Sequence, residues 1–376
     1  MTEHRSQRRR QTYFRLSSQL AQIDTAQLRS LLKPSEPHTG RGHRQTVTVG
    51  DTTLFVKRIP VTDLERDNMF STKNVYDLPT YYNFCFGSVG FNVYRELITH
   101  IKTTNWVLNG EIASFPLLYH YRVVPFLGER TPIGPGQFKD YVEACGGDEN
   151  IGRYMLDRAN ANAELFLFLG YIPNTLHLWL LENLEQIDWV LDELGATLDF
   201  LEKNGIIHDD AHFGNVLTDG ESIYVTDFGI ILDKSFDLQE NEKEFFAAHT
   251  HLSYGMFLLS LFPLVKDKYE ALPASAQQRI REELGLQEQV DNESPALFFA
   301  TLDNIEKIYV EGLMKLDKAY VDCMVRFRDI IRLMAIFFID MWDRPKKDGA
   351  FPNAELQQLL KETSFISDTE DEYKYH

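Results

Sequence analysis

Four polar residues carry the clearest chemistry in this sequence: His208, Asp210, Asn215 and Asp227. They stand in the stretch IIHDDAHFGNVLTDGESIYVTDFG, at the spacing H-x-D-x(4)-N followed by D-F-G. In this arrangement one carboxylate can orient an acceptor hydroxyl, while an amide oxygen and a second carboxylate hold Mg²⁺ against nucleotide phosphates. The pattern therefore favours phosphoryl transfer, with Asp210 as the catalytic carboxylate and with Asn215 and Asp227 as the metal ligands.

The flanking residues predict the elements that must position this site. Apolar residues before it recur at helical spacing: Trp189, Val190, Leu194, Leu198 and Leu201. The pair Asn204-Gly205 is typical of the end of such a helix. After the loop, the apolar runs 216–217 and 223–225 flank a turn at 218–222, which predicts a hairpin. The chain thus supplies a helix, a loop, a hairpin and the metal carboxylate in the order that the chemistry requires.

This run of residues resembles the catalytic segment of the protein-kinase-like superfamily. The pattern His208-x-Asp210-x-His212-x-Gly214-Asn215 is similar to that of aminoglycoside phosphotransferases and related atypical kinases. The resemblance implies an α+β, bilobal protein-kinase-like fold. Its small lobe would hold an antiparallel β-sheet with one key helix, and its large lobe would be mainly helical. The resemblance also implies ATP and Mg²⁺ as cofactors.

The sequence departs from eukaryotic-type protein kinases at three points. Asp209 stands where an arginine usually reads the phosphate of an activation loop, and His212 stands where serine/threonine kinases usually carry a lysine. No A-P-E motif follows the D-F-G. Regulation by activation-loop phosphorylation is therefore not expected. The acceptor is left open between a small molecule and a protein Ser/Thr hydroxyl.

The resemblance extends upstream to the nucleotide side of the site. The run 52–59 looks like the strand that carries the phosphate-binding lysine, which would be Lys57. Before it, Gly40 and Gly42 resemble the start of the G-x-G-x-x-G-x-V loop, and Gln45 replaces the third glycine. Glycines in such a loop let backbone N–H groups approach phosphates closely.

Two further segments complete the expected nucleotide site. Apolar spacing predicts an amphipathic helix over 91–106. This helix carries Glu96, the expected ion-pair partner of Lys57, and Glu65 is the alternative partner. The run 164–169 resembles the last strand of the small lobe. The hinge would follow it, with Gly170 and Ile172 offering backbone groups to the adenine.

The expected organisation has four segments. Residues 1–36 form an N-terminal lead-in, and residues 37–170 form the small lobe with insertions at about 60–90 and 126–162. The second insertion reads as a loop at its start and as a helix near 153–160. Residues 171–366 form the helical large lobe, and residues 367–376 form an acidic tail.

Composition agrees with an ordinary soluble globular protein of 376 residues, 44% apolar and 25% charged. The net charge of −18 opposes binding to nucleic acid or to anionic membranes. Arg5, Arg8, Arg9 and Arg10 form the basic cluster at the N-terminus, and we expect a solvated, flexible terminus there. The three cysteines are far apart and give no disulfide framework. Without a signal sequence or an apolar span, we expect a cytoplasmic protein with no membrane span.

Other interpretations of the same residues are weaker. His208, His212 and Asp210 could form a metal cluster, but histidines suit zinc and no third histidine stands at a suitable spacing. His208 is instead expected to hold the catalytic loop through its ring hydrogen bonds. His249 and His251 point in different directions on a helix and are expected to be structural. Two other functions stay open: a nucleotidyl transferase on the same fold, and a regulatory kinase-like binding protein.

Overall fold

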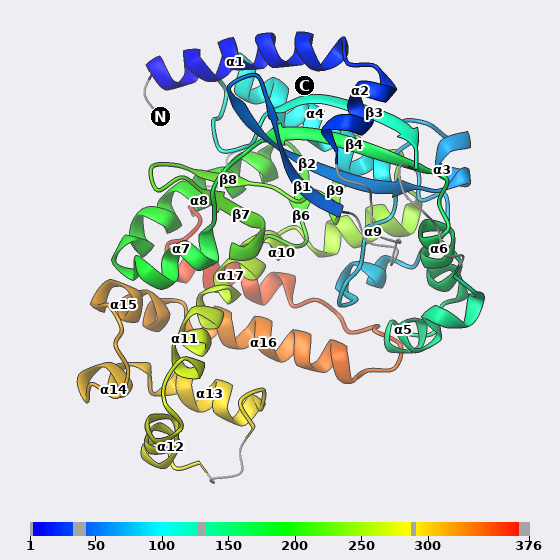
Figure 1. Cartoon of the computed structure of the whole chain (residues 1–376). Coiled ribbons are helices and arrows are strands. Elements are labelled where there is room, and N and C mark those ends of the chain that lie inside the picture. Colours follow the sequence, from blue (N-terminus) through cyan, green and yellow to red (C-terminus); the bar gives the residue numbers. More distant parts are fainter. Residues whose placement is uncertain (1–2, 33–42, 127–132, 287–290, 368–376) are drawn as a thin grey trace.

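The computed structural model describes residues 3–32, 43–126, 133–286 and 291–367, which fold into a mixed α+β structure (Figure 1). Its main sheet has four antiparallel strands in the order β1-β2-β4-β3. These strands are β1 (His43–Val49), β2 (Thr52–Val61), β4 (Ala163–Gly170) and β3 (Leu118–Pro125). The expected small antiparallel sheet is therefore present, and the strands predicted at 52–59 and 164–169 are confirmed as β2 and β4.

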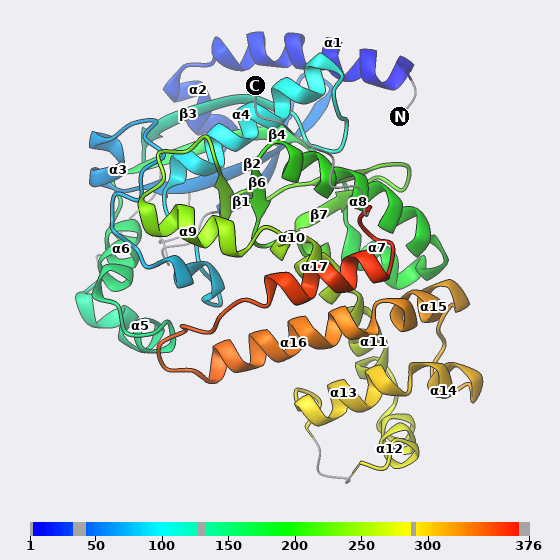
Figure 2. The same ribbon diagram turned by 180° about the vertical axis from the view of Figure 1, so that it is seen from behind.

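Both faces of this sheet are covered, because alternate side chains of a strand point to opposite faces. Leu165 and Leu167 of β4 pack with Leu97 of α4 (Val93–Asn109), which lies across the back of the sheet (Figure 2). Phe166 of β4 belongs to the buried cluster that also contains Leu16 of α1. Helices α1 (Glu3–Ala21) and α2 (Thr25–Leu31) lie over that other face. The predicted amphipathic helix at 91–106 is confirmed as α4.

The N-terminal arginines differ from the expected flexible terminus. They lie on α1, and Arg9 donates hydrogen bonds to the backbone oxygens of Ala113 and Phe115, at 2.7 and 2.5 Å. Arg5 donates to the Tyr224 hydroxyl at 3.0 Å and also pairs with Asp219. The prediction was wrong for these two residues, because a charge cluster in a sequence does not reveal distant partners.

The two predicted insertions pack on each other. The first contains α3 (Asp63–Asp67) and the 3-10 turn η1 (Thr80–Phe84). The second contains η2 (Pro135–Phe138), α5 (Lys139–Ala144) and α6 (Glu149–Ala159), so the predicted helix near 153–160 is confirmed and begins earlier. The rings of Tyr76 and Tyr154 pack across this contact in a tilted arrangement, with centroids 4.6 Å apart. Together the insertions form a separate buried cluster beside the sheet.

The rest of the described chain is mainly helical and begins with the elements around the predicted catalytic loop. These are β5 (Asn174–Thr175), α7 (Leu176–Glu182), η3 (Leu184–Gln186), α8 (Ile187–Lys203), β6 (Ile206–His208), η4 (Phe213–Asn215), β7 (Val216–Thr218), β8 (Ile223–Val225) and β9 (Ile231–Asp233). The predicted helix before the loop is α8. The predicted hairpin is the pair β7 and β8, in which Val216 lies opposite Val225.

The remaining helices are α9 (Glu240–Ala248), α10 (Leu252–Leu259), α11 (Leu261–Glu270), α12 (Ala274–Glu283), α13 (Pro295–Asp303), α14 (Ile305–Val310), α15 (Lys318–Arg326), α16 (Arg328–Asp343) and α17 (Asn353–Glu362). Among them, α9 lies beside the elements around the predicted catalytic loop, and α11 to α16 lie below those elements in Figure 1. None of the helices in the described ranges combines the length and the apolar character that a membrane crossing requires.

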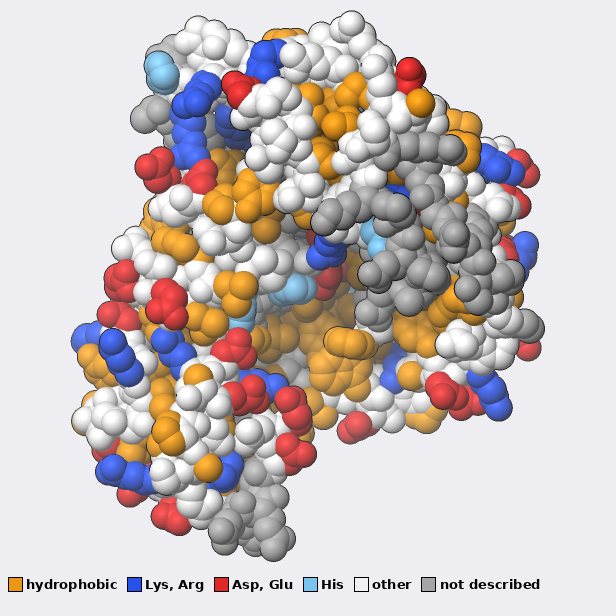
Figure 3. All heavy atoms as spheres, viewed as in Figure 1, with side chains coloured by type: hydrophobic (Ala, Val, Ile, Leu, Met, Phe, Trp, Pro, Cys, Tyr) orange, Lys and Arg blue, Asp and Glu red, His pale blue; other side chains and the backbone are white. Residues whose placement is uncertain are grey.

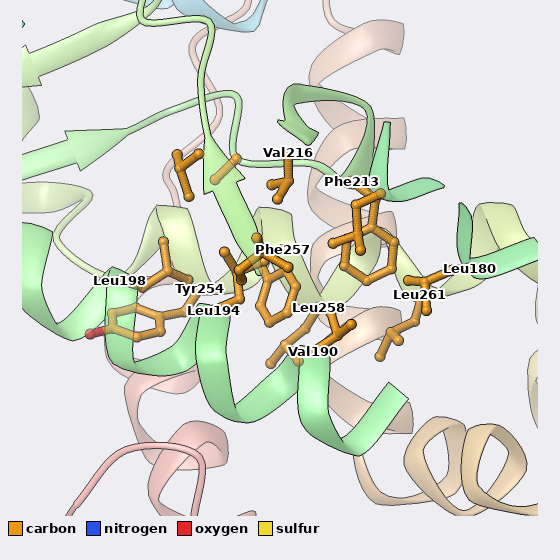
Figure 4. Packing of buried hydrophobic residues seen from close by; sticks show 14 of the residues in the cluster. Leu180, Val190, Leu194, Leu198, Phe213, Val216, Tyr254, Phe257, Leu258 and Leu261 are labelled. Carbon is orange, nitrogen blue, oxygen red and sulfur yellow. The ribbon is translucent and has the colours of Figure 1, made fainter. Parts of the chain in front are cut away.

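A buried apolar core supports the catalytic segment from below (Figure 4). Val190, Leu194 and Leu198 of α8 are almost fully buried, as their spacing predicts. Phe213 of the loop packs against Phe257 of α10, with ring centroids 5.3 Å apart. Burying side chains of this size contributes about 1.5–3 kcal/mol each. The loop therefore rests on a rigid helical base.

Candidate active site

The predicted site residues meet in a cavity of about 420 Å³ between the sheet and the helical part of the chain. Its lining includes Lys57, Glu96, Asp210, Asn215 and Asp227. Figure 3 shows basic, acidic and histidine side chains gathered in the hollow at the centre of this face. The fold thus brings together residues that are up to 170 positions apart, as Lys57 and Asp227 are.

Lys57 lies at the centre of a buried ion-pair network. Its Nζ atom is 2.5 Å from Oε1 of Glu96 and 2.7 Å from Oδ1 of Asp227. The alternative partner, Glu65, is occupied elsewhere, because its carboxylate accepts hydrogen bonds from the backbone N–H groups of Thr62 and Val93. The geometry therefore pairs Lys57 with Glu96.

Electrostatics keep all three members of this network charged. Burial would raise the pKa of Asp227, but the charges of Lys57 and Arg44 outweigh it and hold that pKa well below its usual range. Burial acts on Glu96 in the same way, and Lys57 again reverses it, so the pKa of Glu96 is also lowered. Burial would lower the pKa of Lys57, and the two carboxylates raise it instead. The positively charged ammonium group of Lys57 thus faces the cavity.

Contacts in the N-terminal half of α4 hold Glu96 in place. The Asn92 side chain caps the helix by accepting a hydrogen bond from the Tyr94 N–H at 2.9 Å. The next residue, Arg95, pairs with Glu242 of α9 at 2.7 Å, and both side chains are buried. The ring of His100, one turn further along α4, packs on the ring of Phe228 in the D-F-G segment, with ring centroids 4.7 Å apart. These contacts tie α4 to the helical part of the chain.

Hydrogen bonds orient Asp210, the predicted catalytic carboxylate. The side-chain amide of Asn215 donates to Asp210 twice, to Oδ2 at 2.7 Å and to the backbone oxygen at 3.0 Å. His208 is fully buried beneath the loop, with Nε2 3.0 Å from the Thr226 oxygen and Nδ1 accepting from the Asp210 N–H at 3.3 Å. Burial lowers the pKa of His208, so its ring is neutral. The ring contacts are those predicted for a loop-holding residue.

The two residues that depart from the eukaryotic pattern have distinct surroundings. His212 lies beside Asp210, with Nε2 3.5 Å from Oδ1 of that carboxylate. Its Nδ1 accepts from the Gly214 N–H at 3.0 Å, which leaves the proton on Nε2, facing the carboxylate. Asp209 points the other way and is buried against Asn83 of the first insertion. Burial raises the pKa of Asp209 well above its usual value.

A close backbone approach fixes the position of Asp227. The first insertion ends at Gly90, where an added Cβ atom would lie only 1.8 Å from the backbone oxygen of Gly229. Gly90 has a φ of 78°, which glycine adopts without cost. Asp227 itself has a φ of 59°, an uncommon value outside glycine. The insertion therefore packs directly on the D-F-G segment.

A second cavity of about 300 Å³ adjoins the first and shares Arg44, Lys57, Asn215 and Asp227 with it. The predicted hinge residues Gly170 and Ile172 line it. Its walls include three apolar side chains that could enclose a flat ring: Phe55, Leu169 and Leu217. The other predicted nucleotide-binding residues, Gly40 and Gly42, lie outside the described residues.

The donor atoms around the first cavity suit Mg²⁺ better than zinc. Asp227 offers an ionised carboxylate and Asn215 an amide oxygen, and hard divalent cations prefer oxygen ligands. No group of three or more His, Cys, Asp and Glu side chains suited to a metal ion occurs in the part of the chain that the structure describes. Further ligands for Mg²⁺ would thus come from phosphates and water, as is usual for this ion.

Sequence reasoning missed two cations that line the first cavity. One is Arg158 of α6, and the other is Arg44. Arg44 lies on β1, directly opposite Lys57 of β2, and its Nη2 is 2.8 Å from Oδ2 of Asp227. The sequence did contain a signal for this position, because a tight turn at Gly50 and Asp51 fixes the register of β1 against β2.

No model of a known protein family matches the chain, and no curated protein matches it.

Proposed function

We propose that the protein is an ATP- and Mg²⁺-dependent kinase that transfers the γ-phosphate to a hydroxyl group. One observation carries the proposal: Lys57, paired with Glu96 and Asp227, faces the same cavity as Asp210, which Asn215 orients. A cation for phosphates, a metal carboxylate and a catalytic carboxylate are the parts that this reaction needs. The proposal includes the bilobal protein-kinase-like fold.

The nucleotide would occupy both cavities. Its adenine would lie in the apolar cavity near Gly170 and Ile172, between Phe55 and Leu217. Its phosphates would then extend past Lys57 into the charged cavity, since both cavities share that residue. Lys57 would bind the α- and β-phosphates, and Glu96 would keep the ammonium in place. Asn215 and Asp227 would hold Mg²⁺, which neutralises the charge on the transferred phosphoryl group.

Asp210 would act on the acceptor. The hydroxyl oxygen forms a bond to the γ-phosphorus while the bond between that phosphorus and the bridging oxygen of ADP breaks. Asp210 orients the hydroxyl and accepts its proton. Two hydrogen bonds from Asn215 fix the carboxylate before the acceptor arrives, and such alignment supplies much of the catalysis in this reaction class.

The acceptor would be a small molecule or a protein Ser/Thr hydroxyl. The position of His212 beside Asp210, where serine/threonine kinases usually carry a lysine, supports a reaction outside the eukaryotic-type pattern. Cys85, Cys145 and Cys323 are all free and buried, which agrees with a reducing compartment. We include a cytoplasmic location in the proposal.

The direct test uses purified protein, Mg²⁺ and γ-labelled ATP, with small-molecule and protein fractions of a cell extract as acceptors. We expect ADP and a labelled product. Asp210→Asn should lower the rate by about 10²- to 10⁴-fold while ATP binding is kept. Asp322→Asn, which removes an exposed carboxylate paired with Lys318, is the matched control and should have the wild-type rate.

The products separate the alternatives. Release of pyrophosphate with labelled AMP transfer, followed with α-labelled ATP, would establish a nucleotidyl transferase instead. ATP binding without turnover in any fraction would indicate a regulatory binding protein. Loss of ATP binding in Asp210→Asn would contradict the role given to Asp210.

A further inference from the structure

Arg44 is a second cation at the junction of the two cavities. It lines both of them, and its guanidinium donates to Oδ2 of Asp227 at 2.8 Å. Lys57 occupies the other oxygen of the same carboxylate at 2.7 Å. The Arg44 side chain is 62% exposed, whereas that of Lys57 is 13% exposed. Arg44 is therefore the member of this network that can leave Asp227 at little cost.

Metal binding gives Arg44 a reason to leave. The proposed function places Mg²⁺ on Asp227, and a divalent cation beside that carboxylate would repel a guanidinium held at the same oxygen. The displaced group remains on β1, at the register position opposite Lys57. Nucleotide phosphates bound by Lys57 would lie within its reach. A guanidinium is well suited to that ligand, because its planar array of N–H groups binds phosphate oxygens in pairs.

The sequence around Arg44 also supports phosphate binding by this residue. In the resemblance described above, backbone N–H groups of a glycine-rich loop hold the phosphates, but Gln45 stands at the position of the third glycine. The described part of this segment is already the strand β1, which begins at His43. A loop donor is thus replaced here by strand backbone, and Arg44 supplies side-chain donors at this place.

We propose that Arg44 binds the β- and γ-phosphates of the nucleotide, after moving from Asp227 when Mg²⁺ arrives. This inference rests on the proposed function and extends it, since it assigns a nucleotide-specificity role to a residue outside the predicted set. It makes Arg44 a selector for triphosphate over nucleoside. It also makes Arg44 a competitor of the metal when no nucleotide is present.

The test measures affinities for adenosine, ADP and ATP with Mg²⁺ by calorimetry, in the wild type and in Arg44→Gln. We expect ATP affinity to fall about ten- to a hundredfold, the scale of charge-assisted hydrogen bonds, and adenosine affinity to stay the same. Arg44→Lys should recover part of the loss. The matched control is Arg15→Gln, which removes an arginine of α1 that pairs with Asp51, in the turn between β1 and β2, away from the site.

In a second measurement, the affinity should change in the opposite direction. Titration of Mn²⁺ alone, followed by electron paramagnetic resonance, should show tighter binding in Arg44→Gln than in the wild type, because the competing guanidinium is gone. A purely structural role for Arg44 would weaken adenosine, ATP and Mn²⁺ binding together, and that result would overturn the inference. ATP affinity unchanged in Arg44→Gln would overturn it as well. A wild type that binds no ATP in the calorimetric titration would instead refute the proposed function itself.

Discussion

The two walls of the charged cavity are built on different principles. On one wall, Lys57 of the sheet, Glu96 of α4 and Asp227 of the D-F-G segment are charges that compensate one another at 2.5–2.7 Å, and their side chains are largely buried. On the catalytic loop, Asp210 and His212 are 37% and 43% exposed and are held by hydrogen bonds rather than by ion pairs. One wall stabilises charge, and the other fixes orientation. Breaking the first should reduce stability, whereas breaking the second should mainly reduce rate.

The largest expected effect in stability comes from removing the central cation. Lys57→Met leaves Glu96 and Asp227 without their shared partner, and breaking a buried ion pair in this way costs about 3–5 kcal/mol. Arg44 still compensates Asp227, so we expect the lower value, about 3 kcal/mol, in urea unfolding at pH 7. Lys318→Met, which breaks an exposed pair with Asp322, should leave the midpoint unchanged.

The pH dependence of Lys57→Met sharpens this prediction. In the wild type the pKa values of Glu96 and Asp227 are lowered, so their stabilising contribution is present above the unfolded values near 4 and is lost only at lower pH. Without Lys57, the main charge that opposes burial at Glu96 is gone, so the pKa of Glu96 should rise and its protonation should relieve the cost as the pH falls. The difference in the free energy of unfolding between the variant and the wild type should therefore become smaller as the pH is lowered from 7 to 5. A difference independent of pH would show that lost packing, not charge, is responsible.

A smaller effect on stability, of opposite sign, is expected at Asp209, next to the proposed catalytic carboxylate of Asp210. Burial raises the pKa of Asp209 in the folded state, so the folded protein holds a proton on this residue more tightly than the unfolded chain does, and this lowers stability at any pH where the unfolded carboxylate is ionised. Asp209→Asn removes this cost and keeps the shape, and its amide can both donate to and accept from Asn83. We expect a gain on the order of 1 kcal/mol at pH 7.

The sign of the Asp209 effect can be checked against pH. The gain from Asp209→Asn should grow as the pH rises above about 4, the unfolded pKa of aspartate, and vanish below it. Asp192→Asn, an exposed position on α8, should show no such trend. Destabilisation by Asp209→Asn at pH 7 would mean that the carboxylate is ionised in the folded protein.

These residues also show how far the sequence predicts the molecule. The catalytic loop, its hairpin and the strand of Lys57 follow local patterns, so spacing was enough to place them. Glu96 was preferred because a helical pattern surrounds it. The contact between Asn83 and Asp209 joins positions 126 residues apart, and no local pattern encodes it. The paths of the two insertions and of α1 depend on tertiary packing in the same way, which explains why the N-terminus was predicted wrongly.

The smallest expected effect concerns that N-terminal helix. Arg5 binds Asp219, Glu221 and Tyr224 of the catalytic hairpin, but its side chain is 27% exposed and that of Glu221 is 81% exposed. Exposed ion pairs contribute about 0.2–1 kcal/mol and weaken with salt. Arg5→Gln should therefore lower the free energy of unfolding by less than about 1 kcal/mol, with the loss fading in high salt, and Arg8→Gln at an exposed neighbouring position should not.

Arg9→Gln separates two ways in which α1 can be held. Arg9 bonds backbone oxygens rather than carboxylates, so its contribution should persist in high salt. If thermal unfolding shows no loss for either arginine, α1 is held without a contribution from Arg5 and Arg9, and the burial of Leu16 and Leu20, both at most 1% exposed, becomes its main attachment. A loss for Arg5→Gln that disappears with salt would instead show that α1 clamps the sheet to the catalytic hairpin. The ion pairs of Arg5 would then link the two differently built walls of the cavity electrostatically.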